Sequence, residues 1–520
     1  MINKQYFFNR IIGIIVLLTA YSITATSQKR YDYLTSEFNI SNNVSLNSAI
    51  FSTSIFDNKI KFSNVGINYN NQSGEYHRVQ TGEKISNYGF TSNGSYIGKR
   101  IFMSGSFKFS QQSNKGVRFT SLLNPYRGTP YDLADSSYSN WKSQNYYAVG
   151  KLAYELVPNL LSFGVEVATS VARGAKQVDP RPKTNNSNIE FLPSLSLSTG
   201  AHLFSIGGGY SLFKENVDLI LYNSSESQKI YELKGLGQYT YDIFSSTNRE
   251  RNYNGSGLNA LASYRYRKGA LTLYLEGKYN NYTEEALDIE QSKLRLIGRL
   301  YNSESNLRFE GQYKGGKSLN IIKLHYNSKK LSGREIIEVY NPSETVNNWV
   351  TESEIPQRWQ YSDKTYGAEY LYSLLSNSSQ YAPLTILASA DYKSIKESYR
   401  VMSTYREYDA LYLQIAPTYN INWNSKFFTS FKLSYGLNKI SNFIANYIGR
   451  EESDQTINEI YFNHDAYIMQ QNYNKMGVGI NFGYNLKGVG AFVLSTNYQH
   501  LKANNNLFRN YFISSISYNF

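Results

Sequence analysis

Acid–base chemistry near neutral pH most often uses histidine, and this chain contains five histidines. One of them, His464, is followed directly by Asp465, and a carboxylate beside an imidazole can orient it as a general base. Two adjacent polar side chains in a loop are more often only solvated. Among the sequence motifs of enzymes, HExxH, GxSxG, P-loop and EF-hand patterns do not stand out. We therefore predict that the protein is not an enzyme and has no catalytic, cofactor-binding or metal-binding residues.

Two loops combine prolines with charged side chains. They read NPYRGTPY over residues 124–131 and GAKQVDPRP over residues 174–182, and together they hold four of the ten prolines. Because proline fixes φ and lowers the entropy that a loop loses on ordering, we expect both loops to hold defined shapes. The loops then either present their charges at a mouth or to a partner, or they only cap the fold. The candidate residues are Arg127, Lys176, Asp179 and Arg181.

A second set of charged side chains alternates with apolar ones. Lys151 and Glu155, for example, alternate with the apolar side chains of Leu152, Tyr154 and Leu156. Such charges face away from the apolar side of a strand, so in a closed barrel they line the lumen. There they either bind a solute or form salt bridges that only stabilise the wall. The eight lumen candidates are Lys151, Glu155, Lys293, Arg295, Arg299, Arg308, Glu310 and Lys314.

The elements that must position these charges are β-strands, because alternation of apolar and polar residues over about ten residues recurs along the chain. Apart from Ile11–Ala20, the sequence has no long apolar run, which excludes helical membrane spans of about 18 residues. The 49 tyrosines and 27 phenylalanines suit a barrel wall. The mean hydropathy of −0.47 is expected when only alternate strand residues face lipid.

The connections between strands have two lengths. We expect short turns near 98–99, 158–159, 200–202, 267–270, 302–306, 327–330, 422–426 and 487–490. Longer segments at 71–84, 111–144, 171–189, 214–254, 342–365, 394–408 and 439–474 separate them. This predicts an all-β, transmembrane antiparallel barrel of about 20 strands, with a range of 18 to 22, short periplasmic turns and long extracellular loops.

The N-terminus predicts export. Lys4 and Arg10 precede and flank the apolar run Ile11–Ala20, and Ala25 and Ser27 provide small residues for cleavage. We therefore expect a signal peptide over 1–27, a periplasmic segment over 28–58 that is a further strand or a short plug, and the barrel over 59–520. Without cysteine, the chain has no disulfides, thiolate metal sites or N-terminal cysteine for a lipid anchor.

The C-terminus ends on aromatic residues at alternate positions, Tyr518 and Phe520. This resembles the signal that the outer-membrane assembly machinery reads on the last strand of its substrates. We expect a final strand over about Leu507–Phe520 to pair with a first strand near Ile60–Tyr69 and to close the ring.

With these loop motifs and both chain ends, the sequence resembles an uncharacterised family of Bacteroidota outer-membrane β-barrel proteins, a domain of unknown function (DUF6850). The resemblance implies a barrel in the outer membrane of a Gram-negative bacterium without an assigned activity, so it assigns no functional residues. The composition, rich in Asn, Tyr and Lys, also suits a Bacteroidota genome of low GC content.

Three functions remain open at this stage. The first is a channel or binding barrel for a solute or polymer, alone or as a subunit of an envelope transport complex; the others are a barrel-embedded hydrolase and a docking barrel without transport. The expected partners are outer-membrane lipid, the assembly machinery, and a TonB-dependent transporter or surface lipoprotein. Nucleic acid is not expected, because the basic residues behind the net charge of +13 are scattered rather than clustered.

Overall fold

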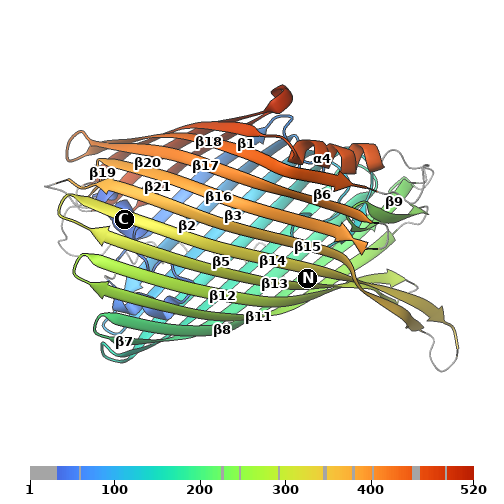
Figure 1. The fold of residues 1–520 in the computed structure, drawn as a ribbon, viewed down its shortest axis with the longest axis horizontal. Helices are drawn as coiled ribbons and strands as arrows, with labels where there is room; N and C mark the ends of the chain where they lie inside the picture. Colours follow the sequence, from blue (N-terminus) through green and yellow to red (C-terminus); the bar gives the residue numbers. More distant parts are fainter. Residues whose placement is uncertain are drawn as a thin grey trace, which may run out of the picture.

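The computed structural model describes residues 32–57, 60–223, 228–244, 248–290, 293–343, 348–376, 381–400, 403–447, 457–486 and 489–520. Eighteen antiparallel strands of the described chain form one sheet, in which β1 pairs with both β2 and β21 and so closes a barrel (Figure 1). No helix in these residues is long and apolar enough to cross a membrane. The signal peptide expected over 1–27 lies outside the described residues.

The wall strands follow one another around the ring in chain order. They are β1 (Ser63–Ser73), β2 (Lys84–Ile97), β3 (Ile101–Val117), β5 (Ser139–Val157), β6 (Leu161–Lys176), β7 (Arg181–Thr199), β8 (His202–Ile220), β11 (Asn248–Lys268), β12 (Leu271–Glu290), β13 (Lys293–Lys314), β14 (Ser318–Asn341), β15 (Asn348–Leu374), β16 (Leu384–Tyr399), β17 (Thr404–Asn422), β18 (Phe427–Asn446), β19 (Tyr473–Leu486), β20 (Gly490–Ala503) and β21 (Phe508–Asn519).

The wall has 18 strands, which lies within the expected range of 18 to 22 and below its central value of about 20. Two expected turns, 302–306 and 327–330, lie inside the continuous strands β13 and β14. Their sequences, NSESN and NSKK, have turn-like composition, but Ser303 pairs with Asn281 on β12 and with Lys330 on β14. Ladder hydrogen bonds on both sides outweigh a local preference for turns.

The wall is apolar outside and polar inside. On β8, the side chains of Phe204, Ile206 and Leu212 are 50%, 64% and 47% exposed, whereas Leu203 and Ser205 between them are buried. Large exposed hydrophobic residues recur in this way on the other wall strands. A water-soluble barrel would bury such side chains, whereas this alternation is what a wall facing lipid requires.

The two ends of the barrel differ, and we call them the turn end and the loop end. At the turn end, neighbouring strands are joined by short connections such as 98–100, 158–160 and 200–201. At the loop end the strands run further than expected, so most of the expected loop 171–189 belongs to β6 and β7. The hairpin of β14 and β15 projects beyond its neighbours there (Figure 1).

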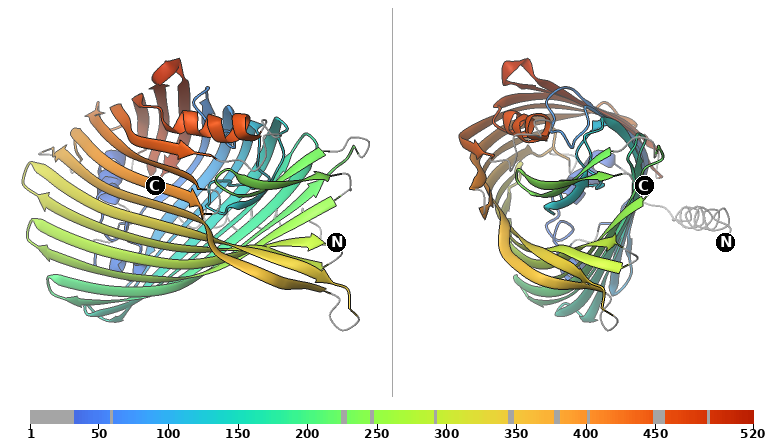
Figure 2. Two further views of the ribbon diagram at one scale, coloured as in Figure 1. Left: turned by 45° about the vertical axis from the view of Figure 1, so that its right-hand side comes forward. Right: turned by 90° about the vertical axis from the view of Figure 1, so that its right-hand side faces the viewer.

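Three loop-end segments fold into the barrel, and we call them the cap. The first (118–138) contains β4 (Tyr131–Ala134), and the second (221–244) contains β9 (Gln228–Gly235) and β10 (Gln238–Phe244). The third (457–472) contains the π-helix η3 (Asn458–Asn463) and the helix α4 (His464–Met469). The sheet β10-β9-β4 lies within the ring of wall strands (Figure 2). One buried cluster, which includes Phe119, Leu233 and Ile457, joins all three segments.

Residues 32–57 lie inside the barrel towards the turn end, where they form α2 (Tyr33–Ser41) and the 3-10 helix η1 (Phe51–Phe56). Ser52 bonds Ser196 of β7, Ser48 bonds Glu276 of β12, and Arg308 of β13 donates to the carbonyl of Asn47. Leu34 packs against β18 and β20 through Phe428 and Val493. The segment therefore touches the wall on opposite sides of the ring. The short helix η4 (Asn504–Asn506) connects β20 to β21.

Candidate functional site: the lumen beneath the cap

Arg127, a candidate from the first proline loop, attaches the cap to the wall. Its guanidinium forms ion pairs with Glu215 on β8, at 3.1 Å, and with Glu284 on β12. The same group lies 4.7 Å from the ring centre of Tyr253 on β11. Gly128 follows with a φ of +117°, a conformation that favours glycine and lets the loop turn back. The loop is therefore folded into the barrel mouth, one of the alternatives that its composition left open.

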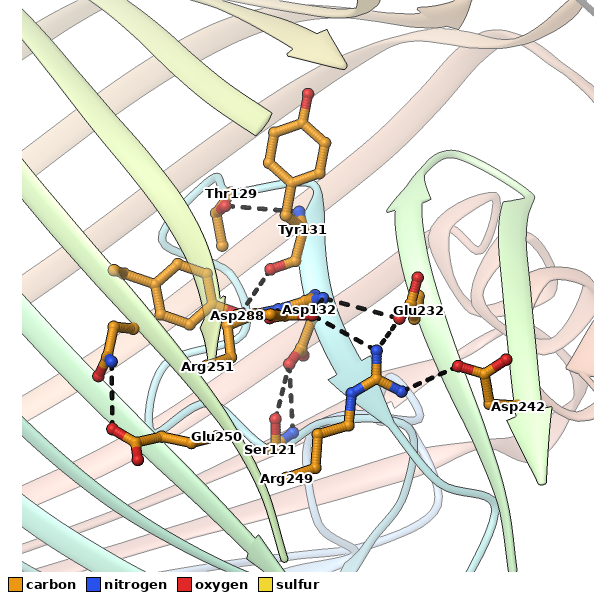
Figure 3. A network of polar contacts seen from close by, with 12 residues as sticks. Ser121, Thr129, Tyr131, Asp132, Glu232, Asp242, Arg249, Glu250, Arg251 and Asp288 are labelled. Carbon is orange, nitrogen blue, oxygen red and sulfur yellow. Dashed lines mark hydrogen bonds and ion pairs between the residues drawn. The ribbon is translucent and has the colours of Figure 1, made fainter. Parts of the chain in front are cut away.

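A second attachment runs through two neighbouring arginines of β11 (Figure 3). Arg251, which is fully buried, donates to Asp288 of β12 at 2.5 and 2.7 Å. Arg249 forms ion pairs with Glu232 on β9, Asp242 on β10 and Asp288. This network joins the inner sheet of the cap to the wall, and each of its charges has an opposite charge beside it.

Asp132 lies at the centre of the cap, on β4, and is only 4% exposed. Its carboxylate accepts hydrogen bonds from the hydroxyls of Thr120 and Ser121 at 2.7 and 3.0 Å. Burial raises the pKa of Asp132 to about 7, although these hydrogen bonds act in the opposite direction. The protonation of Asp132 therefore changes near neutral pH while the cap is in place.

The second proline loop is also attached within the chain. Lys176 is buried and reaches both oxygens of Asp135, at 2.5 and 2.6 Å. Asp179 forms an ion pair with Arg181 at 2.7 Å and accepts the backbone N–H of Tyr222 at 3.1 Å. Of the four loop candidates, Arg181 is the most exposed, with 45% of its side chain accessible.

A cavity of about 360 Å³ lies between the cap and the wall strands β14–β17. The cap contributes polar residues from all three of its segments, and the wall contributes charged and aromatic side chains. Its four cations are paired: Arg78 with Asp465 at 2.5 Å, Lys329 with Glu304 at 3.2 Å, Lys393 with Asp363 at 2.8 Å, and Arg406 with Glu397 at 2.5 Å. The lining therefore offers many hydrogen-bonding groups with balanced charge.

The lumen candidates lie at different levels along the barrel axis, between the turn end and the loop end. Lys151 pairs with Glu166 at 2.8 Å and lies over the ring of Phe51 in the inner segment, while Glu155 accepts the N–H of Asn159 in a turn. Arg308 and Glu310 pair with each other beside the same inner segment. Lys293 and Arg295 lie at the loop end against Tyr340 and Trp349, and Lys314 lines a pocket of about 490 Å³ at the turn end.

Arg299 does not line the lumen, which corrects its assignment. A β-bulge at Ile297 lets Ala286 pair with Gly298 and Leu287 pair with Leu296. Ile297 and Gly298 then both face inward, where they meet Tyr131 and its buried cluster. An extra residue shifts the alternation by one position, so Leu300 is buried and Arg299 pairs with the half-exposed Glu285 and Glu354.

The pair His464 and Asp465 is not arranged as a catalytic dyad. Asp465 is 2% exposed and accepts from Arg78 at 2.7 Å and from the N–H of Val79 at 3.0 Å. The Nε2 atom of His464 lies 3.2 Å from the carbonyl oxygen of His77. No group of three or more metal-ligating side chains gathers in the part of the chain that the structure describes.

The expectation that no P-loop pattern stands out is wrong, because the stretch 311–318, GQYKGGKS, has the spacing of a phosphate-binding loop. That motif needs a strand followed by a loop and a helix, whose backbone N–H groups hold the phosphate. Here the stretch is the end of β13, a tight turn and the first residue of β14. Its glycines serve a hairpin, so the match carries no nucleotide site.

The C-terminal aromatic residues lie at the closure of the wall. Asn519 pairs with Asn64, and Phe520 exchanges two backbone hydrogen bonds with Ser63, at 2.8 and 2.9 Å. Tyr518 packs between the rings of Phe492 and Phe520. The expected pairing of the last strand with the first is confirmed.

The wall partners of the cap were missed from the sequence. Glu215, Arg251, Glu284 and Asp288 were expected in loops or not singled out, yet all four are buried inside the barrel. A carboxylate or guanidinium at every second position of a predicted strand, next to glycine and tyrosine, was the available signal. It marks the inner face, but not the loop that the charge binds.

The family model for the family of unknown function DUF6850 matches residues 51–520. The chain belongs to this family. No curated protein matches it.

Solved structures that resemble the chain include three receptors and transporters. The ferric preacinetobactin receptor BauA from Acinetobacter baumannii has 8% identity and a TM-score of 0.42, with 88% of this chain and 80% of that chain covered. The siderophore receptor PiuA from the same organism has 12% identity and a TM-score of 0.42, covering 89% and 82%. The ferric citrate transporter FecA has 9% identity and a TM-score of 0.38, with 88% of this chain and 78% of that chain covered. At such low values, the strand pairing itself remains the evidence for the barrel.

Proposed function

We propose that this protein is an outer-membrane β-barrel that binds or passes a polar solute or polymer through its lumen, and that the described conformation is closed. The observation that carries the proposal is the cavity of about 360 Å³ held between the cap and the wall. The cap closes the loop end, and residues 32–57 occupy the lumen at the turn end. A solute must therefore displace two closures in series.

The chemistry of the cavity favours a solute without net charge. Its cations are each paired with a carboxylate, so it has no excess charge with which to attract an ion. Its hydroxyl, amide and charged groups provide donors and acceptors for a polar molecule. The identity of that molecule is not encoded in any motif of the chain.

The proposed setting is the outer membrane of a Gram-negative bacterium of the Bacteroidota, reached by means of a signal peptide. The outward apolar face supports the membrane, and the terminal aromatic residues support recognition by the outer-membrane assembly machinery. The protein acts alone or as a subunit of an envelope transport complex, beside a TonB-dependent transporter or a surface lipoprotein. We propose no nucleic-acid partner, no cofactor and no enzymatic activity. The bonds of Asp465 to Arg78 and Val79 support the absence of a dyad.

Planar-bilayer conductance tests the proposal. The wild-type barrel should be silent, and so should variants that release one closure, either by removal of residues 32–57 or by Arg127→Ala. The variant that combines both changes should show steady conductance, because only then are both closures open. A silent combined variant with an intact β-sheet circular dichroism spectrum would instead identify a docking barrel without passage.

A further inference from the structure

Beside Lys61, which precedes β1, and Lys314, which lines the turn-end pocket, five further exposed cations gather at the turn end of the barrel. They lie in or directly beside the turns between β2 and β3, β11 and β12, β13 and β14, and β17 and β18. None of the five makes an ion pair with another described residue. They are Lys99, Arg100, Lys268, Lys317 and Lys426.

The short turns themselves offer these cations no acidic counterpart. The short connections, from 98–100 to 487–489, contain no aspartate or glutamate. Two carboxylates at this end are already engaged: Asp57 pairs with Arg265 and Arg267 at 2.8 and 2.6 Å, and Glu155 accepts the N–H of Asn159. A positive charge therefore remains at this end.

An aromatic residue on the outer side precedes the cation in each of the four hairpins. Tyr96, Tyr313 and Trp423 are 57%, 55% and 63% exposed, and Tyr266 is partly exposed. Each stands two to four residues before its cation. Aromatic side chains at the ends of barrel strands lie at the boundary between hydrocarbon and headgroups. The cations just beyond them therefore lie at the level of the headgroups.

We infer that these five cations, which we call the cationic ring, bind anionic phospholipid headgroups of the leaflet at the turn end. The inference rests on the proposed membrane location. The four hairpins are spread around the wall. Four strands, β5 to β8, separate β3 from β11, and four more, β19, β20, β21 and β1, separate β18 from β2. A folded acidic protein would contact one side of such a ring, whereas the surrounding lipid contacts every hairpin. Lysine and arginine next to an anionic membrane surface are attracted to it by its negative potential.

Native mass spectrometry of the full-length barrel in a neutral detergent tests the inference. The probes are phosphatidylglycerol and phosphatidylcholine at equal concentration. The wild type should retain phosphatidylglycerol in roughly fivefold or greater excess, the ratio expected from one lysine at an anionic surface. Raising the ionic strength should reduce this excess, because exposed charges are screened.

Two sets of substitutions locate the effect. Changing all five ring cations to glutamine should abolish the lipid preference. A matched control changes five exposed lysines that lie further towards the loop end and should keep the preference: Lys142, Lys183, Lys330, Lys364 and Lys439.

Equal retention of both lipids by the wild type, or loss of preference in the control set alone, would overturn the inference. Binding of poly-glutamate without lipid preference would also overturn it, in favour of an acidic macromolecule as partner. Failure of the barrel to insert into vesicles of either lipid would contradict the proposed membrane location instead, so the two failures are distinguishable.

Discussion

The turn end and the loop end are opposite ends of the same strands, but their connections differ in length and in charge. At the turn end the connections are short, lack acidic residues and place cations beyond a belt of aromatic side chains. At the loop end acidic residues outnumber basic ones in the connections, and the longest of these fold inward and are attached by buried ion pairs. Under the proposed membrane location, the cations of the turn end face the lipid headgroups, whereas the buried ion pairs of the loop end hold the cap in the lumen.

The largest expected effect is at the loop end. Arg127→Ala should destabilise the docked cap by about 3–5 kcal/mol, because it leaves Glu215 and Glu284 buried without their cation. Limited proteolysis of the membrane-embedded protein should then cut within residues 118–138, where the wild type resists. The control Arg181→Ala removes an exposed pair and should change stability by about 1 kcal/mol or less. Equal resistance of Arg127→Ala and the wild type would show that the cap is held by other contacts.

The next effect concerns the turn end. Deletion of Phe520 removes its two backbone hydrogen bonds to Ser63 and its stacking on Tyr518. The amount of protein in the outer membrane should fall several-fold, with the loop-end contacts unaltered in the fraction that inserts. Phe520→Tyr, which keeps the ring and the backbone bonds, should insert normally. Normal membrane levels of the deletion would refute the closing role of this residue.

A smaller effect is the pH dependence of cap docking at the loop end. The pKa of Asp132 is about 7 in the docked cap and near the ordinary value for aspartate once the cap is released into water. A raised pKa means that docking is favoured at low pH and that this contribution is lost as the pH rises through 7. Proteolytic cleavage of the wild type within residues 118–138 should therefore become faster from pH 5 to pH 8. Asp132→Asn should flatten this dependence, and an unchanged slope would exclude Asp132 as its source.

The smallest effect separates the two faces of one strand. Arg299→Gln removes a half-exposed pair on the outside of β13 and should cost about 1 kcal/mol or less. In the combined variant with both closures released, it should leave the ratio of cation to anion permeability unchanged. Arg308→Gln, on the inner face of the same strand, should shift that ratio towards cations. A shift of the same size for Arg299→Gln would place Arg299 in the lumen after all.

The alternation of side chains predicted most of the wall, because a lipid-facing strand must repeat apolar residues at every second position. Tyr154 and Leu156, for example, were expected on the apolar face of one strand and are 40% and 45% exposed. The prediction is wrong where the local composition favours a turn but the strand pairing continues, as at 302–306. The predicted position of Arg299 is also wrong, because the extra residue Ile297 exchanges the inner and outer faces of β13 without any change in composition.

The cap could not be predicted from local sequence. Arg127 was singled out as a charge in a rigid loop, but its partner Glu284 lies 157 residues further along the chain. Only the assembled ring brings β8 and β12 to the same loop. The fold was thus accessible from periodicity, whereas the contacts of the site depend on distances across the lumen that periodicity does not contain.

The pairing of β1 with β21 also determines when this molecule can fold. Asn64 and Asn519 are hydrogen-bonded neighbours separated by 455 positions in the chain. A contact order of this kind makes folding slow, since the entropy of closing the largest loop must be lost before the final ladder forms. Until the last strand is synthesised, β1 keeps an open edge that can pair with other chains. The incomplete chain is therefore exposed to aggregation at the edge of β1 until β21 is available to pair with it.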